Sequence, residues 1–238
     1  MEPTPTPTPA FKAMIESIPK RYRNALHEKV LVFPTTVWFG ERAPERLRHW
    51  LELDGKRRAH SGAESVNTLH RRSWESPLTP AETKEIIDLS WPFVREFYRL
   101  YDYCRPYLHG GFTIRYASHE DRALPIHTDD STYTINICLQ NESSGSELVF
   151  ERGATIVPVT PVTGEVIIHL GSAPHRTNPL TAGTRTNLVL WIKAHRSDTG
   201  MDVGMGAGTN AGRGAGTDAG RGAGMDAGMD AVAGGPKD

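Results

Sequence analysis

From residue 112 onward the sequence is a series of short apolar segments separated by turn signals, and this pattern limits the fold more than any other feature. We expect turns at residues 141–145, 163–164 and 181–183. Several short strands within about 80 residues indicate a sandwich or barrel rather than alternating β/α units. The expected strands are residues 112–117, 126–129, 133–140, 147–151, 155–158, 165–170 and 186–194.

The preceding hundred residues contain helix signals and are expected to support the strand region. The clearest signal is a capping box, in which Thr79 is the N-cap, Pro80 the first helical residue and Glu82 the reciprocal acceptor. The apolar stripe that follows is expected to continue until Pro106 stops the helix, and Pro92 is expected to kink or divide it. Elsewhere the pattern predicts an amphipathic helix over 11–29 that Pro19 can divide, a strand pair or broken strand over 29–40, a short helix over 44–53 and a polar loop or lid over 54–76.

The two ends of the chain differ in composition from its middle. Residues 1–10 alternate proline and threonine, which favours polyproline II, so we expect a disordered leader. Residues 198–238 contain tetrapeptide repeats that begin with Ala-Gly, and their period of four excludes a collagen helix. With few large apolar residues this tail is expected to be disordered. The predicted organisation is therefore a leader (1–10), a support region (11–110), a β core (111–197) and a tail (198–238).

Charge and cysteine content narrow the function classes. The net charge of −1 and the pI near 6.8 provide no basic surface, so nucleic-acid binding is not indicated. The two cysteines, Cys104 and Cys138, form neither a disulfide framework nor a zinc spacing. The first residues do not resemble a secretory signal, and no apolar stretch approaches the roughly 20 residues of a membrane span. We expect a soluble, cytoplasmic protein without a membrane partner.

A His-x-Asp pair and two later residues form the candidate site. His127 and Asp129 lie two positions apart, so in an extended strand both side chains point to one face. His175 follows Asp129 by 46 positions, and Arg185 follows His175 by ten. Two imidazoles and one carboxylate form the facial triad that holds non-haem Fe(II) and leaves positions open for substrate and oxygen. An arginine on a later strand can bind a dicarboxylate with two parallel hydrogen bonds.

The order of these residues resembles that of the 2-oxoglutarate- and Fe(II)-dependent dioxygenases, particularly the prolyl and lysyl hydroxylase-like branch. The resemblance covers about residues 112–194 and includes Gly164 before the penultimate strand. Ser146 stands where the family has a second glycine, which is a departure at one turn. The matching segments are His127-Thr128-Asp129, Gly145-Ser146-Glu147-Leu148-Val149-Phe150, His175, and Gly183-Thr184-Arg185-Thr186-Asn187-Leu188 with Trp191.

This resemblance implies a mainly β fold with N-terminal helices (α+β), built on a double-stranded β-helix or jelly-roll core. It implies that His127, Asp129 and His175 hold Fe(II), and that Arg185 pairs with the 5-carboxylate of the cosubstrate 2-oxoglutarate. Molecular oxygen is the second cosubstrate, and ascorbate is a further candidate cofactor. Tyr116, Asn187 and Asn136 are the additional residues expected to bind 2-oxoglutarate.

The implied activity is hydroxylation of a C–H bond with release of succinate and carbon dioxide. A protein or peptide side chain of the proline or lysine kind is the expected substrate. The alternatives are the same chemistry on a small metabolite or nucleobase, a catalytically silent metal-binding jelly-roll that binds a partner, and a zinc hydrolase. Two neighbouring residues are interpreted without a site role: His169 as a satisfied core or rim histidine, and Asp130 as solvated or capping a turn.

Overall fold

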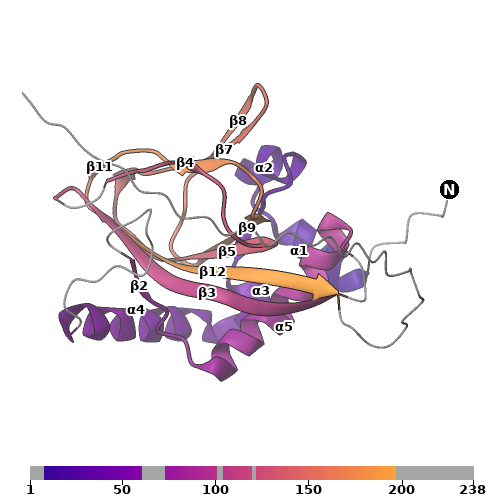
Figure 1. Ribbon diagram of the computed structural model, residues 1–238, viewed down its shortest axis with the longest axis horizontal. Coiled ribbons are helices and arrows are strands. Elements are labelled where there is room, and N and C mark those ends of the chain that lie inside the picture. The colour runs from indigo at the N-terminus through magenta and orange to yellow at the C-terminus, as the bar shows by residue number, and fades with distance from the viewer. Residues whose placement is uncertain (1–7, 61–72, 101–103, 120–121, 197–238) are drawn as a thin grey trace, which may run out of the picture. The chain divides into compact units, whose positions relative to one another are not determined.

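The computed structural model describes residues 8–60, 73–100, 104–119 and 122–196. Two antiparallel sheets face each other, and helices cover the outer face of the larger one, as Figure 1 shows for α4 and α5 below β3 and β12. The predicted jelly-roll braced by N-terminal helices is therefore confirmed. The larger sheet has the order β1 (Leu31–Pro34), β9 (Glu165–Leu170), β5 (Tyr133–Asn141), β12 (Thr184–Arg196), β3 (Cys104–Ala117), β2 (Ser73–Glu75).

The smaller sheet contains shorter strands from the second half of the chain. Its order is β4 (Leu124–His127), β10 (His175–Thr177), β7 (Leu148–Arg152), β8 (Thr155–Val159). A third pair, β6 (Ser144–Gly145) with β11 (Leu180–Ala182), lies at the turns before β7 and β12. The sequence pattern did not predict β2, β6, β10 or β11, because segments of two or three residues are too short to have a period.

The helical elements precede the jelly-roll in the chain. Pro19 divides the first predicted helix, and the capping box at Thr79 is present with both of its hydrogen bonds. Among the described residues no helix is both long and apolar enough to cross a membrane. The elements are α1 (Pro9–Ser17), η1 (Lys20–Tyr22), α2 (Arg23–His27), α3 (Thr36–Phe39), η2 (Gly40–Arg42), α4 (Ala43–His60) and α5 (Pro80–Tyr98).

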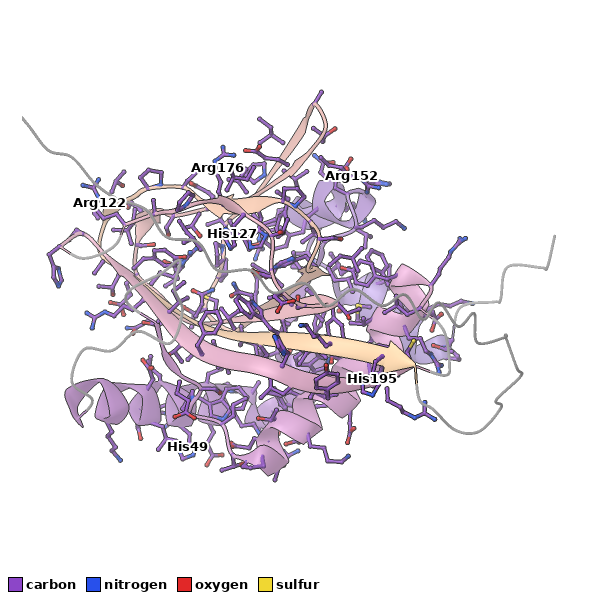
Figure 2. The ribbon with its side chains drawn as sticks, viewed as in Figure 1. His49, Arg122, His127, Arg152, Arg176 and His195 are labelled. Carbon is purple, nitrogen blue, oxygen red and sulfur yellow. The ribbon has the colours of Figure 1, made fainter. Side chains whose placement is uncertain are left out.

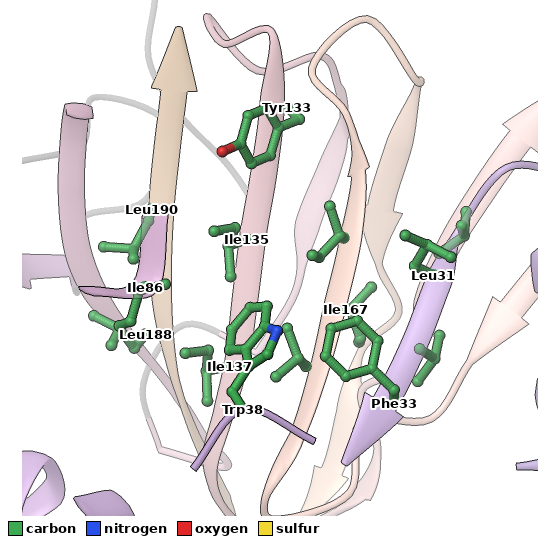
Figure 3. Close-up of a cluster of buried hydrophobic side chains, with 14 of the residues drawn as sticks. Leu31, Phe33, Trp38, Ile86, Tyr133, Ile135, Ile137, Ile167, Leu188 and Leu190 are labelled. Atoms are coloured by element: carbon green, nitrogen blue, oxygen red, sulfur yellow. The ribbon is translucent and has the colours of Figure 1, made fainter. Parts of the chain in front are cut away.

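The main core lies between these helices and the larger sheet (Figure 3). In β5 the alternating residues Tyr133, Ile135 and Ile137 are fully buried toward the helices. Their neighbours Thr134 and Asn136 therefore point to the opposite face, into the space between the two sheets. The period of two places apolar side chains against the helices and polar ones at the candidate site.

Several boundaries differ from the sequence expectation. Residues 36–39 are helical rather than extended, because Trp38 and Phe39 pack edge-to-face against Phe33 and Trp50. Helix α4 continues through residues 54–60, which were expected to be a loop, and Asp54 is buried. Helix α5 is continuous through Pro92, which is exposed. The predicted lid residues 61–72, the leader up to residue 7 and the tail from residue 198 lie outside the described residues, whereas Pro9 and Ala10 belong to α1.

Strand β3 begins at Cys104, eight residues before its predicted start, because it pairs with β12 along its whole length. Cys104 and Cys138 are both free thiols. The support region and the β core belong to one compact unit, and the N-terminal helices share the main core with the larger sheet.

Candidate metal and cosubstrate site

The two predicted histidine ligands and the predicted aspartate meet between the sheets. The Nε2 atom of His127 lies 3.6 Å from Asp129 Oδ1, and the Nε2 atom of His175 lies 3.9 Å from Asp129 Oδ2. One ligand atom from each residue falls within 4.8 Å of the others, a spacing that suits a single metal ion. Figure 2 shows His127 between the smaller sheet and the β3–β12 ribbon. The sequence therefore identified three residues that the fold brings together.

Asp129 does not lie in a strand, contrary to the extended geometry expected for His-x-Asp. Strand β4 ends at His127, and the backbone N–H of Asp129 instead donates to the Gly171 carbonyl at 2.9 Å. His127 and His175 are direct partners across the antiparallel pair of β4 and β10, which places their rings 4.3 Å apart. Strand pairing therefore brings the histidines together, and a loop contact positions the carboxylate.

Backbone carbonyls orient both imidazoles. The Nδ1 atom of His127 lies 2.8 Å from the Pro125 carbonyl, and the Nδ1 atom of His175 lies 2.9 Å from the Ala173 carbonyl. Since Nδ1–H donates to a carbonyl in each case, both Nε2 atoms point toward Asp129. Burial, together with the neighbouring His169, lowers the pKa of His175 to about 3. The Nε2 of His175 is therefore an unprotonated donor atom at neutral pH.

The electrostatic environment keeps Asp129 ionised. Burial acts to raise its pKa, but the close contact with His127, the nearby imidazoles of His169 and His175 and the hydrogen bond from Thr134 outweigh burial and lower this pKa to about 2. Thr134 donates to Asp129 Oδ2 at 2.5 Å. Burial also acts to lower the pKa of His127, but the contact with Asp129 outweighs it and raises that pKa. The site thus combines one carboxylate with two oriented imidazoles.

Asp130 is exposed, but it is not merely solvated or capping a turn. Its carboxylate lies 2.9 Å from Lys193 Nζ on β12 and 3.0 Å from His109 Nε2 on β3. Asp130, the residue next to Asp129, is thus held by contacts to both β12 and β3.

His169 is a site neighbour that the sequence interpretation placed in the core. It is fully buried on β9, and its Nε2 atom lies 3.8 Å from Asp129 Oδ2, as close as the Nε2 of His175. Its Nδ1 lies 2.9 Å from the Leu170 carbonyl, whereas its Nε2 has no hydrogen-bond partner among the described residues. The histidine is therefore only half satisfied. Only the fold places His169 beside Asp129, because no local pattern in the sequence joins the two positions.

Arg185 lies in the same pocket and is almost completely buried. Its guanidinium stacks over the Tyr116 ring at 4.7 Å and donates through Nη1 to the carbonyl of Ser146. Ser146 itself has φ +62°, in the left-handed region that favours glycine, at the turn where the resemblance has a second glycine. Among the described residues the Nε of Arg185 has no partner and no carboxylate forms an ion pair with it. Burial lowers the pKa of this guanidinium.

The remaining predicted residues line the pocket between Arg185 and the triad. Asn187 Nδ2 donates to Asn136 Oδ1 at 2.5 Å, while Asn187 Oδ1 has no partner among the described residues. The Tyr116 hydroxyl lies 3.1 Å from Thr177 Oγ1. The pocket wall comes from both sheets and includes Phe112, Ile114, Tyr116, Leu124, His127, Asp129, Thr134, Asn136, Leu148, His169, His175, Thr177, Arg185, Asn187, Val189 and Trp191.

Gly171 allows the loop of Asp129 to approach β9. A Cβ at this position would lie 2.0 Å from the Ser131 carbonyl oxygen, so no other residue fits without backbone movement. We expect Gly171→Ala to lower the free energy of unfolding by about 1–3 kcal/mol, measured by urea denaturation. Gly55→Ala is the matched control, because Gly55 lies in α4 with open space around it and alanine favours helix. Equal stability of the Gly171→Ala variant and the wild type would contradict the close approach.

No protein-family profile matches the chain. A 2-oxoglutarate and iron-dependent oxygenase domain-containing protein 2 from Xenopus tropicalis is 33% identical over 93 residues, which cover 36% of this chain and 27% of the relative. The 2-oxoglutarate and iron-dependent oxygenase domain-containing protein CP2 from Arabidopsis thaliana is 32% identical over 98 residues, which cover 36% of this chain and 25% of the relative. The matched region thus spans about a quarter of the length of these curated relatives.

Solved structures share the fold over most of the chain. A 2OG-Fe(II) oxygenase family oxidoreductase from Burkholderia pseudomallei aligns with a TM-score of 0.53 at 17% identity, covering 74% of this chain and 90% of that one. A prolyl-4-hydroxylase from Pseudomonas putida aligns with a TM-score of 0.53 at 14% identity, covering 77% and 98%. In fold, and in sequence over part of its length, the chain is therefore similar to the 2-oxoglutarate and iron-dependent oxygenases.

Proposed function

We propose that this protein is an Fe(II)- and 2-oxoglutarate-dependent dioxygenase that hydroxylates a C–H bond, with a protein or peptide side chain as substrate. The single observation that carries the proposal is Arg185, a buried guanidinium without a carboxylate partner among the described residues, in the same pocket as the His127, Asp129 and His175 cluster. A buried charge without a partner costs several kcal/mol. An anionic ligand group at Arg185 removes that cost.

The residues present fit both the metal and the cosubstrate. Two oriented imidazoles and an ionised carboxylate on one side are the ligand set of non-haem Fe(II) oxygenases. A bound dicarboxylate would accept a hydrogen bond from the unpartnered Nε–H of Arg185, and an ordered water beside it would donate to the unpartnered Oδ1 of Asn187. When bound, the metal couples oxidative decarboxylation of 2-oxoglutarate to hydroxylation, which yields succinate and carbon dioxide.

The other pocket residues position the cosubstrate and the metal ligands. Arg185 binds the 5-carboxylate while Tyr116, stacked below the guanidinium, fixes its plane. Asn187 and Asn136 orient the cosubstrate between Arg185 and the metal ligands. Thr134 holds one oxygen of Asp129, so the carboxylate presents the other in a fixed direction. Molecular oxygen is the co-reactant, and a need for ascorbate stays a prediction.

The preference for a peptide substrate rests on the named fold neighbours. One is the prolyl-4-hydroxylase from Pseudomonas putida, and another is a prolyl hydroxylase from Trichoplax adhaerens in complex with a peptide fragment of hypoxia inducible factor. The latter aligns with a TM-score of 0.52 at 13% identity, covering 77% of this chain and 90% of that one. We therefore propose that this chain also acts on a peptide, and that the modified residue is proline or lysine.

The test is anaerobic titration of the Fe(II)-loaded full chain with 2-oxoglutarate, followed by admission of oxygen with proline- and lysine-containing peptides. We expect a visible charge-transfer band, then succinate release stimulated by a peptide that gains one oxygen atom by mass. No band with iron bound and the protein folded would overturn the oxygenase proposal. If the band appears but only metabolites or nucleosides stimulate succinate release, the oxygenase chemistry would stand and the peptide substrate class would be wrong.

The contact of His169 with Asp129 is expected to contribute to metal affinity. We expect His169→Phe to weaken divalent-cation affinity by about 10- to 100-fold, because the ring contacts with Phe150 and His175 persist while the nitrogen beside Asp129 is lost. Calorimetric titration with Co(II) measures this change. His49→Phe is the matched control, since His49 is exposed on α4. An unchanged Co(II) affinity in the His169→Phe variant would make His169 a packing residue only.

A further inference from the structure

A second concave surface lies away from the metal site, between α5 and the first part of β3. This groove encloses about 720 Å³. Tyr107 and Leu108 form one wall and are 41% and 36% exposed, and Ile87 and Trp91 belong to the other wall. The groove is lined by Leu78, Pro80, Thr83, Lys84, Ile87, Asp88, Trp91, Pro92, Arg105, Pro106, Tyr107 and Leu108.

The walls of this groove suit a polyproline II ligand better than an added strand. On the strand side Pro106 has no backbone N–H to donate to an added strand, and on the other side Pro80 and Pro92 belong to α5, a helix that offers no strand edge. Proline-rich segments need no such donors, and they dock in grooves lined by aromatic side chains. Trp91 and Tyr107 supply these aromatic surfaces on opposite walls.

The position of Thr8 connects the groove to one particular proline-rich segment. The backbone N–H of Thr8 donates to Glu96 Oε1 at 2.8 Å, and its hydroxyl donates to Glu96 Oε2 at 2.9 Å. Glu96 follows Pro92 by four residues, so it lies about one helical turn, roughly 5–6 Å, beyond the groove along α5. The segment that precedes Thr8 reads Met-Glu-Pro-Thr-Pro-Thr-Pro. We propose that this leader, residues 1–7, occupies the groove of its own chain as a polyproline II segment.

The length and charge of the leader match the groove. Lys84, Asp88, Pro92 and Glu96 are spaced by four along α5, and Lys84 is about 18 Å from Glu96 at 1.5 Å per residue. A polyproline II segment rises about 3.1 Å per residue, so six residues from Thr8 back to Glu2 span about 19 Å. Glu2 therefore reaches the level of Lys84, whose side chain is 74% exposed and pairs with Asp88 within its own helix. The carboxylate of Glu2 joins this pair at the far end of the groove.

The experiment uses the full chain labelled with 5-fluorotryptophan, with the Trp91 resonance assigned by Trp91→Phe. We compare the solvent isotope shift of Trp91 in the wild type and in the triple variant Pro3→Gly, Pro5→Gly, Pro7→Gly. The expected result is a larger isotope shift at Trp91 in the triple variant, because the indole becomes exposed to water. Thr4→Ser with Thr6→Ser is the matched control and leaves the shift unchanged, since the prolines remain.

A charge exchange tests the register. Glu2→Lys is expected to increase the Trp91 isotope shift, and the combination of Glu2→Lys with Lys84→Glu is expected to restore the wild-type value. An identical Trp91 resonance in the wild type and the triple variant would overturn the proposal. A wild-type shift that increases on dilution would also overturn it, because a second copy's leader would then be the occupant. None of these substitutions lies in the candidate metal site or in the sheets.

Discussion

Replacing His175 with alanine is expected to weaken Fe(II) binding by at least about a hundredfold and to abolish the charge-transfer band with 2-oxoglutarate. In the proposed site His175 is one of three residues that would hold the metal, and its loss would leave only His127 and Asp129 as ligands. Such a loss corresponds to roughly 3 kcal/mol or more of binding free energy. Anaerobic calorimetry with Fe(II) and the visible spectrum measure the two effects independently.

The matched control for this experiment is His195→Ala on β12, because His195 is exposed and contacts the ring of Tyr107 rather than the metal ligands. We expect wild-type affinity in that variant. The thermal unfolding midpoint reports whether each variant is folded. A full band in folded His175→Ala would contradict the assignment of His175 and direct attention to His169, whose Nε2 lies equally close to Asp129.

Replacing Arg185 with methionine is expected to raise the half-saturating concentration of 2-oxoglutarate by about 30-fold or more. In the proposed function the guanidinium of Arg185 binds the distal carboxylate, and loss of a buried charge-assisted pair costs about 2–5 kcal/mol. Methionine fills similar volume without charge. Because Arg185 lacks an ion-pair partner among the described residues, the variant without ligand is expected to be at least as stable as wild type.

Titration of the charge-transfer band measures this change, and urea denaturation of the unliganded protein measures the stability. Arg152→Ala is the control for loss of an arginine, since Arg152 is exposed in the β7–β8 hairpin and away from the pocket. Fe(II) affinity is expected to stay unchanged in Arg185→Met. If the half-saturating concentration of 2-oxoglutarate were unchanged, Arg185 would not bind the cosubstrate, and its buried charge would have to bind a different anion.

Local chemistry explains why much of the fold was predictable. Alternation in β5 and β12 places Ile135 and Leu190 toward the helices, and this period of two is visible in the sequence. The capping box at Thr79 is a contact over three residues, so the sequence contains all of its parts. Segment 36–39 was predicted incorrectly, because burial of Trp38 and Phe39 against distant aromatic residues outweighs their strand propensity. The early start of β3 likewise depends on pairing with β12.

The sequence by itself determined which residue types were available for the site and the face of the strands on which many of them lie. His127, Asp129, His175 and Arg185 could be selected because their chemistry and order are local or sequential properties. Only the tertiary structure decided that a loop held by Gly171 carries Asp129, and that His169 lies beside it. The reason is physical: these contacts join residues 40 or so positions apart, and their geometry depends on how two sheets pack.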